Sequence, residues 1–145
     1  MSGFMIAAPQ SGSGKTTVLR MLAGAMQELV IGDPALLVTD VGPVIDDQSL
    51  KVLNDHAARM ERESRLLGRT PLPAGLAGHF FAPCAFEIES ISKLEREVFG
   101  PILHVVRYRA RELDSVIDAI NNTGYGLTLG VHSRIEAFAD QVIRL

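Results

Sequence analysis

Short apolar runs recur along the chain, and Gly, Pro or polar residues bound each of them. A run of four to eight apolar residues between such turn signals is typical of a buried strand. These runs predict strands over residues 3–8, 65–68, 101–108 and 127–133, and an extended, aromatic-rich segment over residues 79–88.

Amphipathic segments separate the apolar runs. Apolar side chains spaced three or four positions apart predict helices over residues 15–29, 48–64, 111–120 and 134–145, and residues 90–97 are expected to add one or two helical turns. Because strands and helices alternate, the sequence predicts an α/β fold. We expect a mostly parallel sheet with right-handed crossovers and helices on both of its faces.

Two potentially reactive side chains are predicted to take no part in chemistry. His56 lies near the polar side of the predicted helix 48–64, so we expect it to be exposed and not a ligand. We expect Cys84 to have no nearby His, Arg or Lys that could lower its pKa, and so to be a buried structural thiol.

Composition narrows the class of protein. With 145 residues, of which 47% are hydrophobic and 21% charged, the chain has the size and composition of one packed domain. A formal net charge of -3 without a Lys/Arg cluster argues against nucleic acid or an anionic membrane as the main partner. No apolar run reaches the ~20 residues of a membrane span, and the N-terminus lacks the pattern of a secretory signal. A single cysteine fits a reducing compartment, so we expect a cytoplasmic protein.

A Gly-rich stretch between the first strand and the first helix is a candidate phosphate site. It partly matches the nucleotide-binding pattern G-x-x-x-x-G-K-[ST], although Pro9 stands at the first Gly position. The candidate phosphate-binding residues are Gly12, Gly14, Lys15 and Thr16, since backbone N–H groups, an ammonium and a hydroxyl would face the anion. Residues 1–18 resemble the start of the cobyrinic acid a,c-diamide synthases. The alternative is a strand-to-helix turn that binds no nucleotide.

Residues 97–101, Glu-Val-Phe-Gly-Pro, end a charged segment and lead into the apolar run 101–108. They place the carboxylate of Glu97 and the ring of Phe99 at the mouth of a predicted strand, where α/β sheets tend to build ligand sites. Spacing alone favours a plain helix-to-strand turn over a ligand site.

Several further motifs, in order along the chain, resemble one enzyme family. They are residues 32–34 (Gly-Asp-Pro), 40–45 (Asp-Val-Gly-Pro-Val-Ile), 78–83 (Gly-His-Phe-Phe-Ala-Pro) and 122–134. With residues 97–101, they make the chain from about residue 19 to 145 resemble the NAD(P)-dependent aldehyde dehydrogenase superfamily. The stretches 39–46 and 125–130 are most similar to the aldehyde dehydrogenase half of the bifunctional proline-utilisation A flavoenzymes.

This resemblance implies part of an aldehyde dehydrogenase catalytic domain, with NAD as cofactor and L-glutamate γ-semialdehyde as the aldehyde oxidised to glutamate. It also implies that Glu97 binds the nicotinamide ribose hydroxyls and that Phe99 packs beside the nicotinamide. The chemistry agrees, because a carboxylate accepts two hydroxyl donors well and an aromatic face orients a flat ring. The resemblance therefore favours a cofactor site over a plain turn.

The resemblance also implies an incomplete active site. The family's nucleophilic Cys, general-base Glu and dinucleotide-binding domain lie upstream of the matched region and have no counterpart here. Aldehyde oxidation through a thioester needs both an activated thiolate and a base. We therefore expect no turnover from the chain alone, and we assign no catalytic residue and no metal ligand. Residues 1–18 are interpreted as a P-loop-like leader, and residues 19–145 as a partial catalytic domain.

Two alternatives stay open at the level of sequence. One is an ATP-binding module that uses the Gly-rich stretch with magnesium, a cofactor that ranks below NAD. The other is a non-catalytic association domain, in which exposed apolar surface drives homo-oligomer formation.

Overall fold

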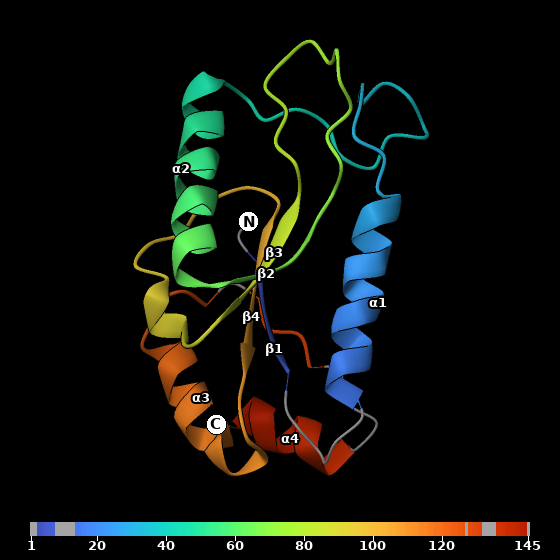
Figure 1. Cartoon of the computed structure of the whole chain (residues 1–145). Coiled ribbons are helices and arrows are strands. Elements are labelled where there is room, and N and C mark those ends of the chain that lie inside the picture. The colour runs from blue at the N-terminus through green and yellow to red at the C-terminus, as the bar shows by residue number, and fades with distance from the viewer. Residues whose placement is uncertain (1–2, 8–13, 127, 132–135, 145) are drawn as a thin grey trace.

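The structure is a computed structural model that describes residues 3–7, 14–126, 128–131 and 136–144 (Figure 1). Its strands are β1 (Gly3–Ala7), β2 (Arg65–Arg69), β3 (Cys84–Ile88) and β4 (Ile102–Arg107). Its α-helices are α1 (Gly14–Glu28), α2 (Asp47–Glu63), α3 (Leu113–Asn121) and α4 (Glu136–Arg144). Two 3₁₀ helices, η1 (Ile91–Lys93) and η2 (Ala110–Glu112), complete the elements.

The strands form one sheet in the order β1-β4-β3-β2. β4 pairs in parallel with both β1 and β3, whereas β2 and β3 are antiparallel. Residues 70–83 connect β2 to β3 as a loop without a helix, whereas a parallel pair is usually joined by a helical crossover. Figure 1 shows α1 on one side of the strands and α2 and α3 on the other. The predicted α/β fold, with a mostly parallel sheet covered on both faces, is confirmed.

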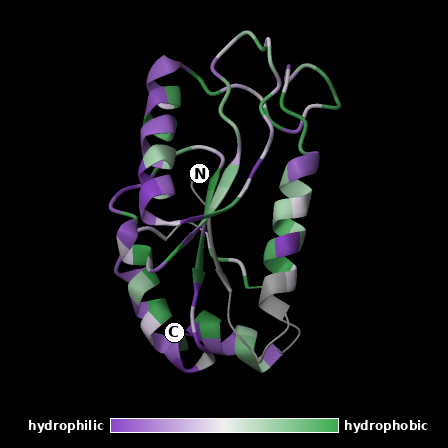
Figure 2. Cartoon of the chain, in the orientation of Figure 1, coloured by the Kyte–Doolittle hydropathy of each residue, from purple (hydrophilic) through white to green (hydrophobic). Residues whose placement is uncertain are grey.

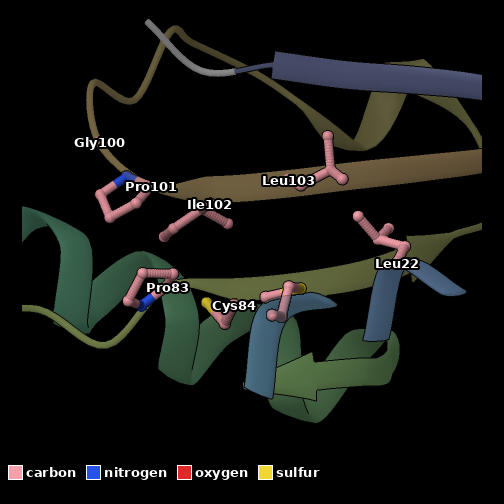
Figure 3. Close-up of a pocket in the computed structure, with 8 residues that line it drawn as sticks. Leu22, Pro83, Cys84, Gly100, Pro101, Ile102 and Leu103 are labelled. Carbon is pink, nitrogen blue, oxygen red and sulfur yellow. The ribbon is translucent and has the colours of Figure 1, made fainter. Parts of the chain in front are cut away.

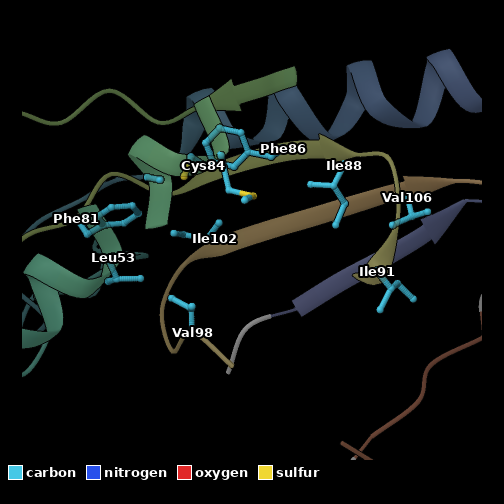
Figure 4. Packing of buried hydrophobic residues seen from close by; sticks show 11 residues of the cluster. Leu53, Phe81, Cys84, Phe86, Ile88, Ile91, Val98, Ile102 and Val106 are labelled. Carbon is cyan, nitrogen blue, oxygen red and sulfur yellow. The ribbon is translucent and has the colours of Figure 1, made fainter. Parts of the chain in front are cut away.

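The main core lies between α2 and one face of the sheet. Asp46 caps α2 by accepting a hydrogen bond of 2.7 Å from the backbone N–H of Ser49. The apolar side of α2 then packs on alternate residues of β3 and β4, while its outer side is hydrophilic (Figures 2 and 4). The buried cluster comprises Leu53, Ala57, Met60, Phe81, Cys84, Phe86, Ile88, Ile91, Val98, Ile102 and Val106.

Three charged side chains on neighbouring strands interact near the end of β4. The carboxylate of Glu87 on β3 accepts hydrogen bonds from Arg65 on β2, at 2.9 Å from Nε, and from Arg107 on β4, at 2.7 Å from Nη2. These bonds hold the pKa of Glu87 below its usual range, with Arg107 the larger influence. The three side chains tie neighbouring strands together.

A smaller cluster joins the C-terminal helices. Tyr108, Leu113 and Ile117 are buried there, and Phe138 and Val142 of α4 pack against them. The predicted helix 134–145 is thus confirmed, within the described residues, as α4 (Glu136–Arg144). None of the helices in the described part of the chain is long and apolar enough to cross a membrane.

The strand predicted over residues 127–133 is not found where it can be tested. Residues 128–131 are described and form no strand, and Leu129 is 60% exposed. The apolar pattern there has no sheet partner among the described residues, and strand preference depends on packing against neighbouring strands. Residues 127, 132 and 133 lie outside the described part of the chain.

Candidate functional site

The segment 97–101 connects η1 to β4 and holds both cofactor candidates of the sequence. Val98 is 3% exposed and belongs to the main core, so it anchors the segment from the inside. Glu97 is half-buried, whereas the Phe99 ring is 66% exposed. The carboxylate of Glu97 has no hydrogen-bond or ion-pair partner in the described part of the chain. The segment thus offers a free acceptor and an uncovered aromatic ring two residues apart in sequence.

Helix α2 packs against this segment at Gly100. Gly100 has a φ of +143°, and a Cβ added to it would stand 2.5 Å from Cδ2 of Leu53, which is fully buried. Glycine is therefore required at this position both by the backbone conformation and by the neighbouring side chain. The Gly100 carbonyl accepts a bond of 2.9 Å from the Ile102 N–H, and the Pro101 carbonyl accepts one of 3.1 Å from Cys84.

An apolar hollow of about 270 Å³ borders the segment on the α1 side (Figure 3). Its lining comes from α1, the amino ends of β3 and β4, and the segment itself: Leu22, Met26, Pro83, Cys84, Gly100, Pro101, Ile102 and Leu103. The hollow can admit an apolar group, but the described residues that line it supply no charged side chain for acid–base chemistry.

Cys84 is a poor nucleophile in this setting. The side chain is fully buried, and burial raises its pKa to about 11. Strand pairing places Arg69 opposite Cys84, although the two residues are far apart in sequence. The positive charge of Arg69 lowers the pKa of Cys84, but the effect of burial is larger. The prediction of a buried structural thiol is confirmed, although the predicted lack of a nearby Arg or Lys is wrong.

The two candidate sites of the sequence lie toward opposite ends of the sheet. Ala7, the last residue of β1, pairs with Arg107 at the end of β4, whereas the segment 97–101 precedes β4. Leu22 and Met26, in the second half of α1, reach the hollow beside Gly100, so the first turn of α1 lies further away. Sheets of this type bind ligands beyond the carboxyl ends of their strands. The strand-end argument for residues 97–101 is therefore wrong, because they sit at the amino end.

The phosphate-binding prediction stays a prediction. Gly14, Lys15 and Thr16 form the first residues of α1, as expected for such a site. Gly12 lies outside the described residues. Among the residues that are described, no three His, Cys, Asp or Glu side chains come together in a group that could hold a metal ion.

His56 and His104 form a buried pair that the sequence did not reveal. The prediction of an exposed His56 is wrong, because the side chain is 7% exposed and its Nε2 lies 2.9 Å from Nε2 of His104 on β4. The pKa of His104 falls to about 4, mainly because of burial and then because of the charge on His56, and burial also lowers the pKa of His56. His104 lies within an apolar run, so only its alternation with Ile102 and Val106 hinted that it faces α2.

Comparisons with known proteins agree on one family. The profile described as the aldehyde dehydrogenase family matches residues 11–144. The bifunctional protein PutA of Klebsiella aerogenes is 44% identical over 134 residues, covering 86% of this chain and 10% of that protein. The 1-pyrroline-5-carboxylate dehydrogenase of Geobacillus kaustophilus is 33% identical, covering 83% of this chain and 23% of that enzyme.

Solved structures agree as well. Proline utilization A from Bradyrhizobium japonicum superposes with a TM-score of 0.83 at 50% identity, over 89% of this chain and 13% of that one. A γ-glutamyl-γ-aminobutyraldehyde dehydrogenase from Burkholderia cenocepacia superposes at 0.81 with 25% identity, over 98% of this chain and 28% of that one. The chain therefore spans about a tenth to a quarter of the length of the relatives that it matches.

Proposed function

This chain belongs to the aldehyde dehydrogenase family, and we propose that it supplies the nicotinamide-ribose part of an NAD site through Glu97 and Phe99. NAD, when bound, accepts the hydride in this chemistry. The enzyme concerned would oxidise L-glutamate γ-semialdehyde to glutamate, since the similar proteins include PutA and 1-pyrroline-5-carboxylate dehydrogenases.

One observation carries the cofactor proposal: a partnerless carboxylate and an exposed ring share one anchored segment. Glu97 can accept hydrogen bonds from two vicinal hydroxyls without first breaking an ion pair. Phe99 offers 66% of its surface, enough to cover one face of a flat ring. Val98 and the Leu53 contact of Gly100 anchor the backbone that carries both side chains, which lowers the entropy cost of binding.

The chain on its own is proposed to be inactive in aldehyde oxidation. Its single cysteine is Cys84, and a thiol with a pKa of about 11 is protonated at neutral pH. Among the described residues that line the hollow beside it, none carries a carboxylate or imidazole to act as a base. The nucleophile and base would have to come from elsewhere in an enzyme of this family.

Titration of the 145-residue chain with NAD, followed by calorimetry, tests the proposal. Glu97→Gln is expected to weaken binding about tenfold, because it removes a charged acceptor for hydroxyl donors. Glu89→Gln is the matched control, since Glu89 is an exposed glutamate outside the segment. The proposal would be contradicted if the wild-type chain did not bind NAD, or if the two variants changed NAD affinity equally. Binding of ATP with magnesium that disappears in Lys15→Ala would instead support the nucleotide-module alternative.

A specific observation favours a second role, association between chains. Three consecutive apolar residues, Leu36, Leu37 and Val38, are 56%, 108% and 64% exposed. Exposed apolar surface of this kind marks contact sites. Sedimentation velocity should show self-association that Leu37→Asp weakens and that Leu72→Asp, at an exposed leucine outside residues 36–38, leaves unchanged. A monomeric wild-type chain would remove this second role.

A further inference from the structure

The buried imidazole pair joins α2 to β4, the strand that follows the candidate cofactor segment in the chain. His56 and His104 are 7% and 1% exposed, and their rings meet edge to face with centroids 5.0 Å apart. On either side of His104 along β4, Ile102 and Val106 point to the same face and belong to the main core. The pair is therefore a polar contact enclosed by apolar side chains.

The 2.9 Å between the two Nε2 atoms requires one proton between them. His104 Nδ1 is the one buried side-chain nitrogen or oxygen that lacks a partner in the described part of the chain. A buried N–H without an acceptor is the rarer arrangement in proteins, so we assign the proton to His104 Nε2. His104 then donates and His56 Nε2 accepts, which leaves no unpaired N–H on His104.

The same face of α2 makes a second contact with the segment. Leu53 lies one helical turn before His56 and blocks any side chain at position 100. Gly100 leads through Pro101 into β4, on which His104 lies. Two consecutive turns of α2 thus make these contacts: Leu53 lies against Gly100 in the segment, and His56 lies against His104 in β4.

We propose that the His56–His104 pair is a positioning device that fixes α2 along β4 and thereby sets the placement of Glu97 and Phe99. Apolar packing alone would let α2 shift along the sheet, because it is non-directional, whereas one directional bond selects one placement. The cofactor part of this inference rests on the proposed function. The two histidines are positioning residues, since neither contacts the segment's exposed face.

Charges around the pair make it sensitive to protons. Arg59, one turn further along α2, and Arg96, just before the segment, both act on His56, and Arg59 also acts on His104. With these two cations, and no carboxylate of the described residues, acting on the rings, the rings stay neutral at neutral pH and keep the shared proton. If both rings were protonated, each Nε2 would carry a hydrogen. The two N–H groups would then repel each other, and the rings would move apart.

Hydrogen exchange in the full chain tests the placement directly. The N–H groups of Cys84 and Ile102 bond to Pro101 and Gly100, so their exchange rates report on the segment. The double variant His56→Leu/His104→Leu keeps the site filled with apolar groups and is expected to retain global protection. Exchange at Cys84 and Ile102 should nevertheless rise at least tenfold, and NAD affinity should fall several-fold.

Two further variants separate positioning from packing. His104→Gln keeps a side-chain N–H donor toward His56 and is expected to restore slow exchange at both amides. His79→Gln is the matched control, because His79 also contacts α2, with its Nδ1 2.9 Å from Oδ1 of Asp47, and should change neither readout.

Wild-type exchange rates at Cys84 and Ile102 in the double leucine variant would overturn the inference. Failure of His104→Gln to restore slow exchange where the leucine variant loses it would also overturn it. If the wild-type chain binds no NAD, the proposed function fails, and the exchange rates still decide whether the pair places the segment.

Discussion

Gly100 lies against Leu53 so closely that a Cβ on the glycine would stand 2.5 Å from the leucine's Cδ2. Cβ atoms in proteins essentially never approach another atom this closely. The residue also adopts a φ of +143°, which L side chains rarely reach. This single contact links the segment carrying Glu97 and Phe99 to the buried face of α2.

Gly100→Ala is expected to destabilise the chain by about 2–5 kcal/mol, the sum of backbone strain and overpacking. Gly75→Ala separates the two causes, since Gly75 has a φ of +81° with nothing within 4 Å of its added Cβ. Its cost should be about 1–2 kcal/mol from strain alone. Denaturant unfolding followed by circular dichroism measures both values, and equal costs would show that Leu53 does not restrict position 100.

Acidification should destabilise the chain through the histidine pair. The folded state holds the pKa of His104 near 4, below the ordinary value of 6.5, so the unfolded chain binds more protons between these values. Stability is complete above pH 6.5 and is lost as the pH falls toward 4. The loss is on the order of 2 kcal/mol by pH 4.5. Unfolding free energies measured from pH 7.5 to 4.5 should show a smaller slope in the double leucine variant, and an unchanged slope would refute this origin.

Cys84 should resist thiol reagents in the folded chain. Full burial keeps reagents away from the Cys84 sulfur, and a pKa raised to about 11 leaves little of the thiol as thiolate. At pH 8 we expect labelling roughly a thousandfold slower than in 6 M guanidinium, because reaction must await an opening of the core. Mass spectrometry of the modified chain over time gives both rates. Rapid labelling without denaturant would show that the hollow beside Cys84 admits solvent and reagent.

Glu87→Gln should loosen the contact between three strands. The carboxylate serves both Arg65 and Arg107, so its neutralisation is expected to cost about 1 kcal/mol, discounted because both arginines reach solvent. High salt should reduce the difference from wild type. Asp55→Asn provides the comparison, since its exposed pair with Lys51 should contribute about 0.3–0.5 kcal/mol. Equal effects of the two variants would mean that the strand-crossing group adds nothing beyond a surface pair.

The sequence predicted the regular elements well where the pattern was local. The helix expected over residues 48–64 forms as α2 (Asp47–Glu63), and the strand expected over 101–108 forms as β4 (Ile102–Arg107). Periodicity succeeds here because each element buries one face or both faces. The same reasoning failed over residues 128–131, since an apolar run without a sheet partner in the described chain does not become a strand.

The candidate site was only half visible in sequence. Glu97 and Phe99 stood out through the family resemblance of their motif, and the structure leaves both side chains available. His56 was placed on the wrong face of its helix, and His104 was hidden in an apolar run. A neutral histidine resembles a polar surface residue in any pattern, and only a partner from another element makes its burial tolerable.

By itself the sequence determined the order of strands and helices, the family motifs and the pairing of a carboxylate with a ring at residues 97–99, because these depend on neighbours along the chain. The tertiary structure decided that Arg69 faces Cys84, that Leu53 limits Gly100 and that His56 meets His104. Each of these contacts joins residues far apart in sequence, so it exists only once α2 and the sheet have packed. Long-range packing thus sets where residues 97–101 lie, whereas the chemical groups that they carry follow from the local sequence.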